Sequence, residues 1–475
     1  MNLINPYNFV PLGSGPKRST PPQWERLHDK NYSGVLVCEL SPLRPLISLD
    51  HEEQRRNNKT HTLVDEKGNR LKNKKGKEYE PIKVFRFLRN SQNQPILQGT
   101  TLKGLIRSIY ETLTDSCLTL ELTTGSAKKG NQEIPYNYQD PGTYKNIECN
   151  RLDNLCPACR LFGTIEGDNV HYQGRLVFSD AVLTAGKLSD GRRIFLKELS
   201  HPKPFHRATY GKSTSAGGPI AGRKFYYHHS SSPEYQVEQH KSNDRSFAVD
   251  EMAGLGCKFR FTITLTNLTE GELGNLLLAL ELDRNGNGEL AHKLGVGKAL
   301  GLGSCRIRVD QHASRVYGAA ARYAGWEEPG ATGWYALKSP DTAISLHLRE
   351  VLRLNKYTEG TIAYPGFKSY PKDPIDDTGV FGGNYKIPHS RLSTPKATLE
   401  TTAVSPPESP PPRVGPDQIA AWLKSVDLQQ DRLIFVDVNG EEHHRPASSF
   451  QGKKNTLEPR HWFILWGEKA SRRAP

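Results

Sequence analysis

The sequence predicts an α+β fold, and three observations lead to that prediction. Short runs in which apolar and polar residues alternate indicate strands, and the clearest is CKFRFTITLTNL at 257–268. Two other segments repeat apolar residues at the three- and four-residue spacing of amphipathic helices. The 42 glycines and 32 prolines indicate many turns and long loops around a modest core.

The first half of the core is expected to run strand, helix, strand. SGVLVCEL (33–40) is rich in valine and leucine, which favours a strand. PILQGTTLKGLIRSIYETLTD (95–115) contains the most regular helical spacing of the chain, and Thr100 or Thr101 is the expected N-cap. GRLVFSDAVLT (174–184) is the next expected strand.

The second half continues with the strand at 257–268 and a second amphipathic helix, ELGNLLLALEL (272–282). HKLGVGKALGLGSCRIRVD (292–310) is a glycine-rich turn that leads into a final strand. The complete order is strand, helix, strand, strand, helix, strand. That is the βαββαβ order of a ferredoxin-like or RNA-recognition-type core, here with large insertions.

The rest of the chain is divided by composition. The predicted regions are a core domain at 1–315, an irregular extension at 316–393, a proline-rich linker at 394–416 and a small α/β module at 417–475. Within the core domain, the predicted insertions are a basic loop at about 48–82, a cysteine-bearing insertion at 117–172 and a loop rich in histidine and glycine at 190–255. The C-terminal module is expected to contain one helix, DQIAAWLKSV, and two strands.

The charge of the chain favours a polyanionic partner. The formal net charge is +13, and phosphate contacts of Lys and Arg give affinity for nucleic acid of any sequence. KGNRLKNKKGK (67–77) has six basic residues in eleven and no acid, so it is either a solvated loop or a basic finger on RNA. No run approaches the roughly 20 apolar residues that span a bilayer, and the N-terminus lacks an export signal. We expect a cytoplasmic protein with no membrane partner.

The segment CNRLDNLCPACRLFGT carries Cys149, Cys156 and Cys159 at close spacing. Seven cysteines, an odd number, in a chain without an export signal favour metal ligation over a disulfide framework. Three thiolates leave a zinc tetrahedron one ligand short, and either Cys117 or His171 could complete it. We expect Cys117, because a helix end packed under the insertion would bring it near. A structural Zn²⁺ is therefore predicted, and a cluster of unliganded thiols is the alternative.

Two features suit the binding of phosphate groups. Lys103 and Arg107 lie on the first turns of the helix that starts near Thr101, where exposed backbone N–H groups attract anions. The turn GVGKALGLGS lets the backbone approach a ligand closely. Its candidate residues are Gly295, Gly297, Lys298, Gly301 and Gly303.

The segment GRKFYYHH (222–229) has three possible roles. Arg223 and Lys224 could contact RNA, and the adjacent histidines could stack on its bases. His228 and His229 could act as acid–base groups in RNA scission through the 2′-hydroxyl. The histidines could equally have a structural role in the loop.

Several of these segments together resemble the RAMP proteins of CRISPR–Cas systems. QGTTLKGLIRSIYE is similar to their GSSLKGxxR helix start, CPACRLFG to their CPxCRLFG segment, and GVGKALGLGS to their C-terminal glycine-rich loop. PYNFVPL and GRKFYYHH resemble segments of the type III RAMP group. The resemblance covers about residues 5–310.

The resemblance implies an RNA-recognition-type core that grips CRISPR RNA within a type III effector complex. Its implied partners are the guide RNA, the target RNA and the other subunits, and the basic loop becomes a thumb that kinks the duplex. Lys103, Arg107 and Lys298 would contact guide phosphates. Asp50 would be the candidate for target-RNA cleavage with Mg²⁺, although LISLDHEEQRRNN departs from the usual catalytic loop. The alternative is a stand-alone, metal-independent endoribonuclease that processes CRISPR RNA through His228 or His229.

Overall fold

The chain divides into two compact units, Met1–Ser390 and Arg391–Pro475. The structure is a computed structural model, and the residues it describes are 3–4, 6–22, 30–65, 67–72, 75–118, 124–129, 132–137, 149–166, 170–189, 193–197, 199, 221–229, 235–236, 247–283, 288–318, 333–337, 343–354, 361–362, 364, 380–381, 385–386, 418–427, 432–437, 442–446 and 462–466. Among these residues, no helix is long and apolar enough to cross a membrane.

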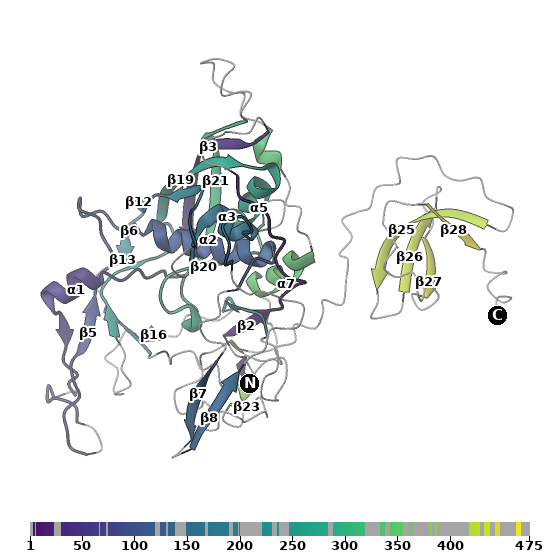
Figure 1. The fold of residues 1–475 in the computed structure, drawn as a ribbon. Helices are drawn as coiled ribbons and strands as arrows, with labels where there is room; N and C mark the ends of the chain where they lie inside the picture. Colours follow the sequence, from purple (N-terminus) through teal and green to yellow (C-terminus); the bar gives the residue numbers. More distant parts are fainter. Residues whose placement is uncertain are drawn as a thin grey trace. The chain divides into compact units, whose positions relative to one another are not determined.

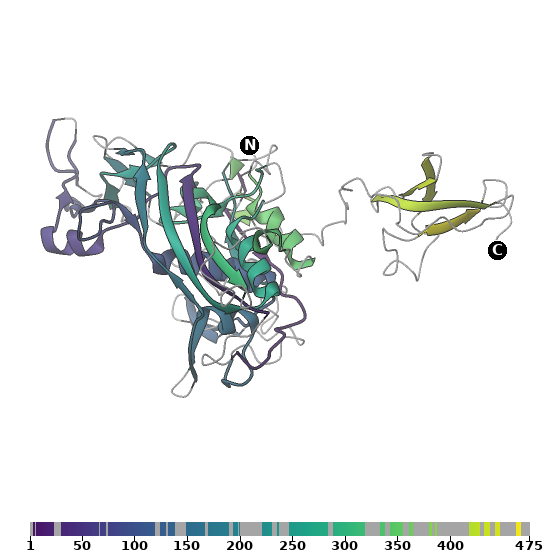
Figure 2. The same ribbon diagram turned by 90° about the horizontal axis from the view of Figure 1, so that it is seen from above.

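The first unit is built on a mixed α+β arrangement with one large antiparallel sheet. Three long strands form its centre, namely β3 (Tyr32–Pro42), β19 (Lys258–Leu268) and β21 (Ser304–Gly318). β3 pairs with both of the others, and Figure 2 shows the three side by side. The order is β20-β21-β3-β19-β12-β6, and β11 also pairs with β19. The shorter strands are β20 (His292–Lys293), β12 (Ala181–Ala185), β6 (Ile96–Leu97) and β11 (Leu176–Phe178).

The sheet has one buried face. Along β19 the residues Phe259, Phe261 and Ile263 are buried, and they alternate with exposed Lys258 and Arg260. Helices α2 (Gly99–Leu113) and α5 (Glu270–Leu280) pack against each other, and Figure 1 shows them in front of the long strands. The strands and helices predicted from the clearest periodicity are therefore present.

The start of α2 differs from the prediction. The helix begins at Gly99, and neither Thr100 nor Thr101 caps it, since the N-cap residue is Gln98 and makes no side-chain cap bond. Instead the Gly99 N–H donates to Oδ1 of Asp180 at 2.7 Å. The cap thus comes from the segment between β11 and β12, which also splits the strand predicted at 174–184 into two.

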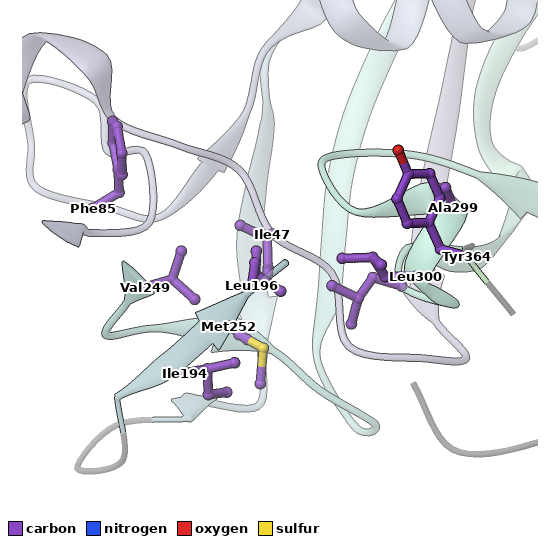
Figure 3. Close-up of a cluster of buried hydrophobic side chains, with 10 residues drawn as sticks. Ile47, Phe85, Ile194, Leu196, Val249, Met252, Ala299, Leu300 and Tyr364 are labelled. Atoms are coloured by element: carbon purple, nitrogen blue, oxygen red, sulfur yellow. The ribbon is translucent and has the colours of Figure 1, made fainter. Parts of the chain in front are cut away.

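All three predicted insertions contain regular structure, and two of them, at about 48–82 and at 190–255, are joined. Strands from both join in a second sheet of order β16-β14-β17-β5-β4, and helix α1 packs on β5. Its elements are α1 (His51–Asn57), β4 (Thr60–His61), β5 (Ile82–Phe85), β14 (Ile194–Leu196), β16 (Tyr235–Gln236) and β17 (Phe247–Val249). A buried apolar cluster joins this sheet to the glycine turn, and Figure 3 shows Ile47 and Leu196 between Val249 and Leu300.

The segment GRKFYYHH also contains a strand. β15 (Arg223–Tyr226) pairs antiparallel with β2 (Tyr7–Val10), so Lys224 lies opposite Phe9. The remaining elements of this unit are β1 (Leu3–Ile4), β7 (Thr124–Lys129), β8 (Gln132–Asn137), α3 (Pro157–Phe162), β9 (Gly163–Glu166), β10 (Val170–Gln173), β13 (Leu188–Ser189), β18 (Met252–Ala253), η1 (Lys298–Leu300), η2 (Trp334–Ala336), α7 (Ala343–Leu352), β22 (Thr361–Ile362), β23 (Val380–Phe381) and β24 (Tyr385–Lys386).

The second unit contains an antiparallel sheet of order β27-β26-β25-β28. Its strands are β25 (Gln418–Asp427), β26 (Arg432–Asp437), β27 (Glu442–Pro446) and β28 (Trp462–Trp466). The helix predicted over DQIAAWLKSV is wrong, because this segment is β25. Its backbone pairs with a strand on each side, which overrides the weak helical spacing of its apolar residues.

The cap on α2 gives a first prediction. Asp180→Ala should lower the free energy of unfolding by about 1 kcal/mol, because it removes the acceptor of the Gly99 N–H. Thr100→Ala, in an exposed residue of the same helix, should lower it by less than about 0.5 kcal/mol. Chemical denaturation of the full chain measures both changes. Equal losses in the two variants would contradict the assignment of the cap to Asp180.

Candidate nucleic-acid interface and metal centre

A pocket of about 480 Å³ lies between α2, β15 and the glycine turn. Four of the residues predicted to bind RNA line it, although they are far apart in the sequence. They are Thr101, Lys224, Gly295 and Lys298. The other predicted RNA-binding residues, Lys103, Arg107, Arg223, Gly297, Gly301 and Gly303, are not among the lining residues.

Three lysines converge on this pocket. Lys224 lies with its Nζ 3.7 Å from the ring centroid of Tyr7 and 5.4 Å from that of Tyr226, and the Nζ of Lys298 lies 5.7 Å from the Tyr226 ring. Burial lowers the pKa of Lys224 to about 8, and the positive charge of Lys298 adds to the effect. Burial also lowers the pKa of Lys298. Cations held close together in a poorly solvated place favour an anion beside them.

The third lysine holds the glycine turn in place. The Nζ of Lys293 donates to the carbonyl oxygens of Lys298, at 3.3 Å, and Leu302, at 3.1 Å. Burial lowers the pKa of Lys293 to about 7. At Gly303, whose φ is +75°, a side chain would collide with the Leu294 carbonyl oxygen. The turn therefore needs glycine for its own folding, while Lys298 at its tip faces the pocket.

The two arginines predicted to bind RNA, Arg107 and Arg223, pair with protein groups instead. Arg107 pairs with Glu111 at 2.7 Å and donates to the carbonyl oxygen of Gly163 at 3.0 Å. Arg223 is 8% exposed, pairs with Glu111 at 3.2 Å and donates to the carbonyl oxygens of Ser116 and Cys117. Both guanidinium groups thus join α2 to the cysteine-bearing segment. Lys103 is half-buried, and its pKa is lowered by burial and by Arg107.

The four predicted cysteine ligands lie together. The Sγ atoms of Cys117, Cys149, Cys156 and Cys159 lie within 4.8 Å of one another, and all four residues are buried. The Sγ of Cys117 is 3.6 Å from that of Cys159 and 3.5 Å from that of Cys156. His171 lies on β10 and is not a member of this group.

This donor set fits a zinc ion. Tetrahedral sites with four thiolates have Zn–S distances of about 2.3 Å, which separate neighbouring sulfur atoms by a little under about 4 Å. The contacts of Cys117 with Cys156 and Cys159 are of that size. Hydrogen bonds among the four sulfur atoms lower the pKa of the Cys149 and Cys156 thiols and raise the pKa of the Cys117 and Cys159 thiols, so without a metal they share protons within the cluster. The group could therefore hold a metal ion between the end of α2 and the start of α3.

Asp50 has a structural role in helix α1. Its Oδ1 accepts a hydrogen bond from the Glu53 N–H at 2.9 Å, which makes it the N-cap. Among the described residues, the cysteine cluster is the only group of three or more potential metal ligands, and Asp50 is not in it.

The two histidines are buried beneath the glycine turn. His228 is 3% exposed, with Nδ1 2.8 Å from the Ser304 Oγ and Nε2 3.0 Å from the Ala291 carbonyl oxygen. His229 packs under Gly301, where an added Cβ would lie 2.9 Å from its Nδ1. Burial lowers the pKa of both imidazoles to about 3, and the charge of Lys293 adds to this. Both side chains are therefore neutral near pH 7 and support the turn from below.

The sequence analysis missed some lining residues of the pocket. Tyr226 lies two residues after Lys224 on the same strand, and the three consecutive aromatic residues of GRKFYYHH were the sequence signal for it. On α2 the missed residues Gly104 and Ser108 line the pocket together with the predicted Thr101, at intervals of three and four residues. That helical spacing of small residues was visible in the sequence.

Comparison with known proteins identifies the family. Residues 61–306, more than half of the chain, match the RAMP superfamily. The chain belongs to the RAMP superfamily. No curated protein matches it.

Among solved structures, the chain is similar to one described as a Type IV-B CRISPR complex. The two share 16% identity with a TM-score of 0.25, over 59% of this chain and 91% of the other. It is also similar to Csc2 of Thermofilum pendens, with 14% identity and a TM-score of 0.27, over 64% of this chain and 75% of the other.

The burial of Arg223 gives a second prediction. Arg223→Ala should lower the free energy of unfolding by about 3 kcal/mol, because it removes the donor of Glu111 Oε2 and of two carbonyl oxygens. Arg308→Ala, in an exposed residue of β21, should lower it by less than about 0.5 kcal/mol. Urea unfolding of the full chain measures both. A small loss for Arg223→Ala would mean that the arginine is free to contact a ligand.

Proposed function

We propose that this chain is a cytoplasmic RNA-binding subunit of a type III CRISPR–Cas effector complex and binds the guide RNA. The observation that carries the proposal is the convergence of Lys224, Lys293 and Lys298 on one pocket. Among the described residues that line the pocket, none is acidic. Membership of the RAMP superfamily and the resemblance of five segments to RAMP proteins of CRISPR–Cas systems support the same proposal.

The chemistry of the pocket suits an RNA backbone. A phosphate beside Lys224 and Lys298 would restore the charged form of both lysines, whose pKa values burial lowers. The formal charge of +13 adds an attraction that does not depend on base sequence. In this proposal the target RNA pairs with the bound guide, and other subunits extend the assembly.

The strand order supports a ferredoxin-like core as part of the proposal. Four strands follow one another along the chain in the order β3, β12, β19, β21. In the sheet their order is β21-β3-β19-β12, and every neighbouring pair is antiparallel. Helix α2 lies between the first and second of these strands in the chain, and α5 between the third and fourth. Both helices pack on one side, as in a βαββαβ domain.

We assign the cysteine cluster a structural Zn²⁺. Bound zinc would supply a covalent link between the end of α2 and the segment that follows it, and no reaction. Cys117 would come from the end of α2, and Cys156 and Cys159 from the first turn of α3. Arg107 would lie beside the site, since its guanidinium is 3.9 Å from the Cys159 Sγ.

No observation favours cleavage over binding. Cleavage of target RNA through Asp50 and Mg²⁺ stays a prediction from the resemblance, and the carboxylate is already used as a helix cap. The alternative endoribonuclease would need His228 or His229 to exchange protons with RNA near neutral pH. Burial and a pKa of about 3 make both histidines poorly suited to that task.

The binding proposal is tested with RNA and two lysine variants. Lys298→Ala and Lys224→Ala should each weaken binding of single-stranded guide RNA by about tenfold, and each should reduce the slope of log K against log salt by about 0.7. Filter binding at several salt concentrations measures both quantities. Arg308→Ala, a cationic residue outside the pocket, is the control for a general loss of charge. Unchanged RNA affinity and unchanged salt slope in both lysine variants would show that RNA does not bind at the pocket.

The zinc assignment is tested by metal analysis. The purified chain should contain about one zinc per molecule, and Cys117→Ser should lose most of it. His171→Ala should keep its zinc, because His171 is outside the cluster. Chelation should lower the melting temperature of the wild type and leave that of Cys117→Ser nearly unchanged. Zinc retained by Cys117→Ser and lost by His171→Ala would reverse the assignment of the fourth ligand.

A further inference from the structure

Residues 11–20 form a strap, the segment that continues from the end of β2, and one end of it is bound beside the cysteine cluster. The backbone N–H of Gly13 donates to Oδ1 of Asp115 at 3.0 Å, and that of Gly15 donates to Oδ2 at 2.7 Å. Both carboxylate oxygens thus hold the strap. Asp115 lies just after α2 and two residues before Cys117, which is the ligand from this part of the chain.

The other end of the strap is bound to the segment that carries the remaining ligands. Ser19 and Leu155 form an antiparallel bridge, in which the N–H of each donates to the carbonyl oxygen of the other at 3.0 Å. The hydroxyl of Thr20 donates to the carbonyl oxygen of Asp153 at 2.9 Å. Leu155 directly precedes Cys156. One strap therefore connects the two parts of the chain that meet at the cluster.

The strap lacks the apolar packing that holds the two helices of the site together. α2 contacts α3, and the buried rings of Tyr110 and Phe162 lie 5.4 Å apart between them. In contrast, no residue of the strap is buried, and hydrogen bonds attach it at both ends. Segments with few buried apolar contacts open at a lower free-energy cost than packed helices. The strap should therefore open while α2 and α3 stay packed.

The cysteines need such an opening to exchange a metal ion. The four residues are between 0% and 3% exposed. A metal ion can reach or leave sulfur atoms buried this deeply only when part of the protein around them opens.

We propose that the strap controls metal exchange at the cysteine cluster. Bound at both ends, it holds Cys117 against the segment of Cys156, and its release from either end is the step that limits entry and exit of the ion. The inference rests on the proposed structural Zn²⁺ and adds a part of the protein that makes the bound ion slow to leave.

The test weakens each end of the strap in turn. Asp115→Asn keeps one acceptor oxygen, and asparagine tolerates the φ of +46° at this position. Ser19→Pro removes the N–H that donates to Leu155. Each variant loses about one hydrogen bond, so each should release zinc to a chromogenic chelator about fivefold faster than the wild type. The absorbance of the zinc–chelator complex is followed with the full chain.

Two further variants separate the strap from general effects. Asp153→Asn makes the same chemical change in an exposed side chain that pairs with Arg151, and it should release zinc at the wild-type rate. Thr20→Val removes only the hydroxyl that donates to the Asp153 carbonyl oxygen, and it should also release zinc faster. Thr20→Val decides the result for this end if Ser19→Pro does not fold. Melting temperatures measured before the assay show which variants are folded.

Proteolysis observes the strap directly. Trypsin cleaves after Lys17 and Arg18, within the strap, when this segment opens. Because metal binding and strap closure favour each other, removal of zinc with a chelator should speed these two cuts several-fold. Cleavage after Lys67, an exposed residue of the basic loop, is the internal reference and should keep its rate. Equal rates at the strap with and without zinc would contradict the inference.

The outcomes separate the inference from the zinc assignment. If the wild type contains zinc and the variants of both ends release it at the wild-type rate, only the inference is wrong. Faster release from the variants of one end alone also overturns it, because the strap acts through both ends. If the purified wild type contains no zinc, the zinc assignment is wrong and the inference falls with it.

Discussion

The arrangement of the first unit depends on one buried cation, Arg223. Its guanidinium satisfies Glu111 and two carbonyl oxygens at the end of α2, next to the cysteine cluster. A desolvated charge of this kind is tolerated only with its partners in place, so it fixes the position of β15 on α2. The next residues of β15 include Lys224 and Tyr226, which line the pocket. The cysteine cluster and the pocket are therefore supported by the same contact.

The glycine turn is fixed from two sides. His228 and His229 lie beneath it, and Leu300 and Leu302 belong to the apolar cluster that includes Ile47 and Leu196 (Figure 3). Strands from two insertions contribute to that cluster, so the insertions form part of the base on which Lys298 rests. The pocket is lined by α2, β15 and the glycine turn, and packing against the apolar cluster helps to fix the position of the turn relative to the other two.

The sequence could predict the elements whose pattern is local. β3, α2, β19, α5 and β21 lie where periodicity indicated them, and Cys117 joined its three partners because a helix end fixes its position. The sequence could not show whether a cation faces a ligand or a buried carboxylate, so Arg107 and Arg223 were grouped with Lys224 and Lys298. It also gave no sign that β25 pairs on both edges, nor that Asp180 caps a helix 81 residues earlier in the chain.

The pKa of about 8 at Lys224 has a consequence for proton exchange. At pH 7 about a tenth of this side chain is uncharged, far more than for an ordinary lysine, because of burial and the charge of Lys298. An anion that settles beside it stabilises the ammonium form, so association takes up a proton from the solvent. Linkage is reciprocal, so a pH above about 8 loosens the complex, whereas acidification below pH 7 changes it little because the lysine is already charged. If Lys224 binds phosphate as proposed, binding and proton uptake at this side chain are coupled.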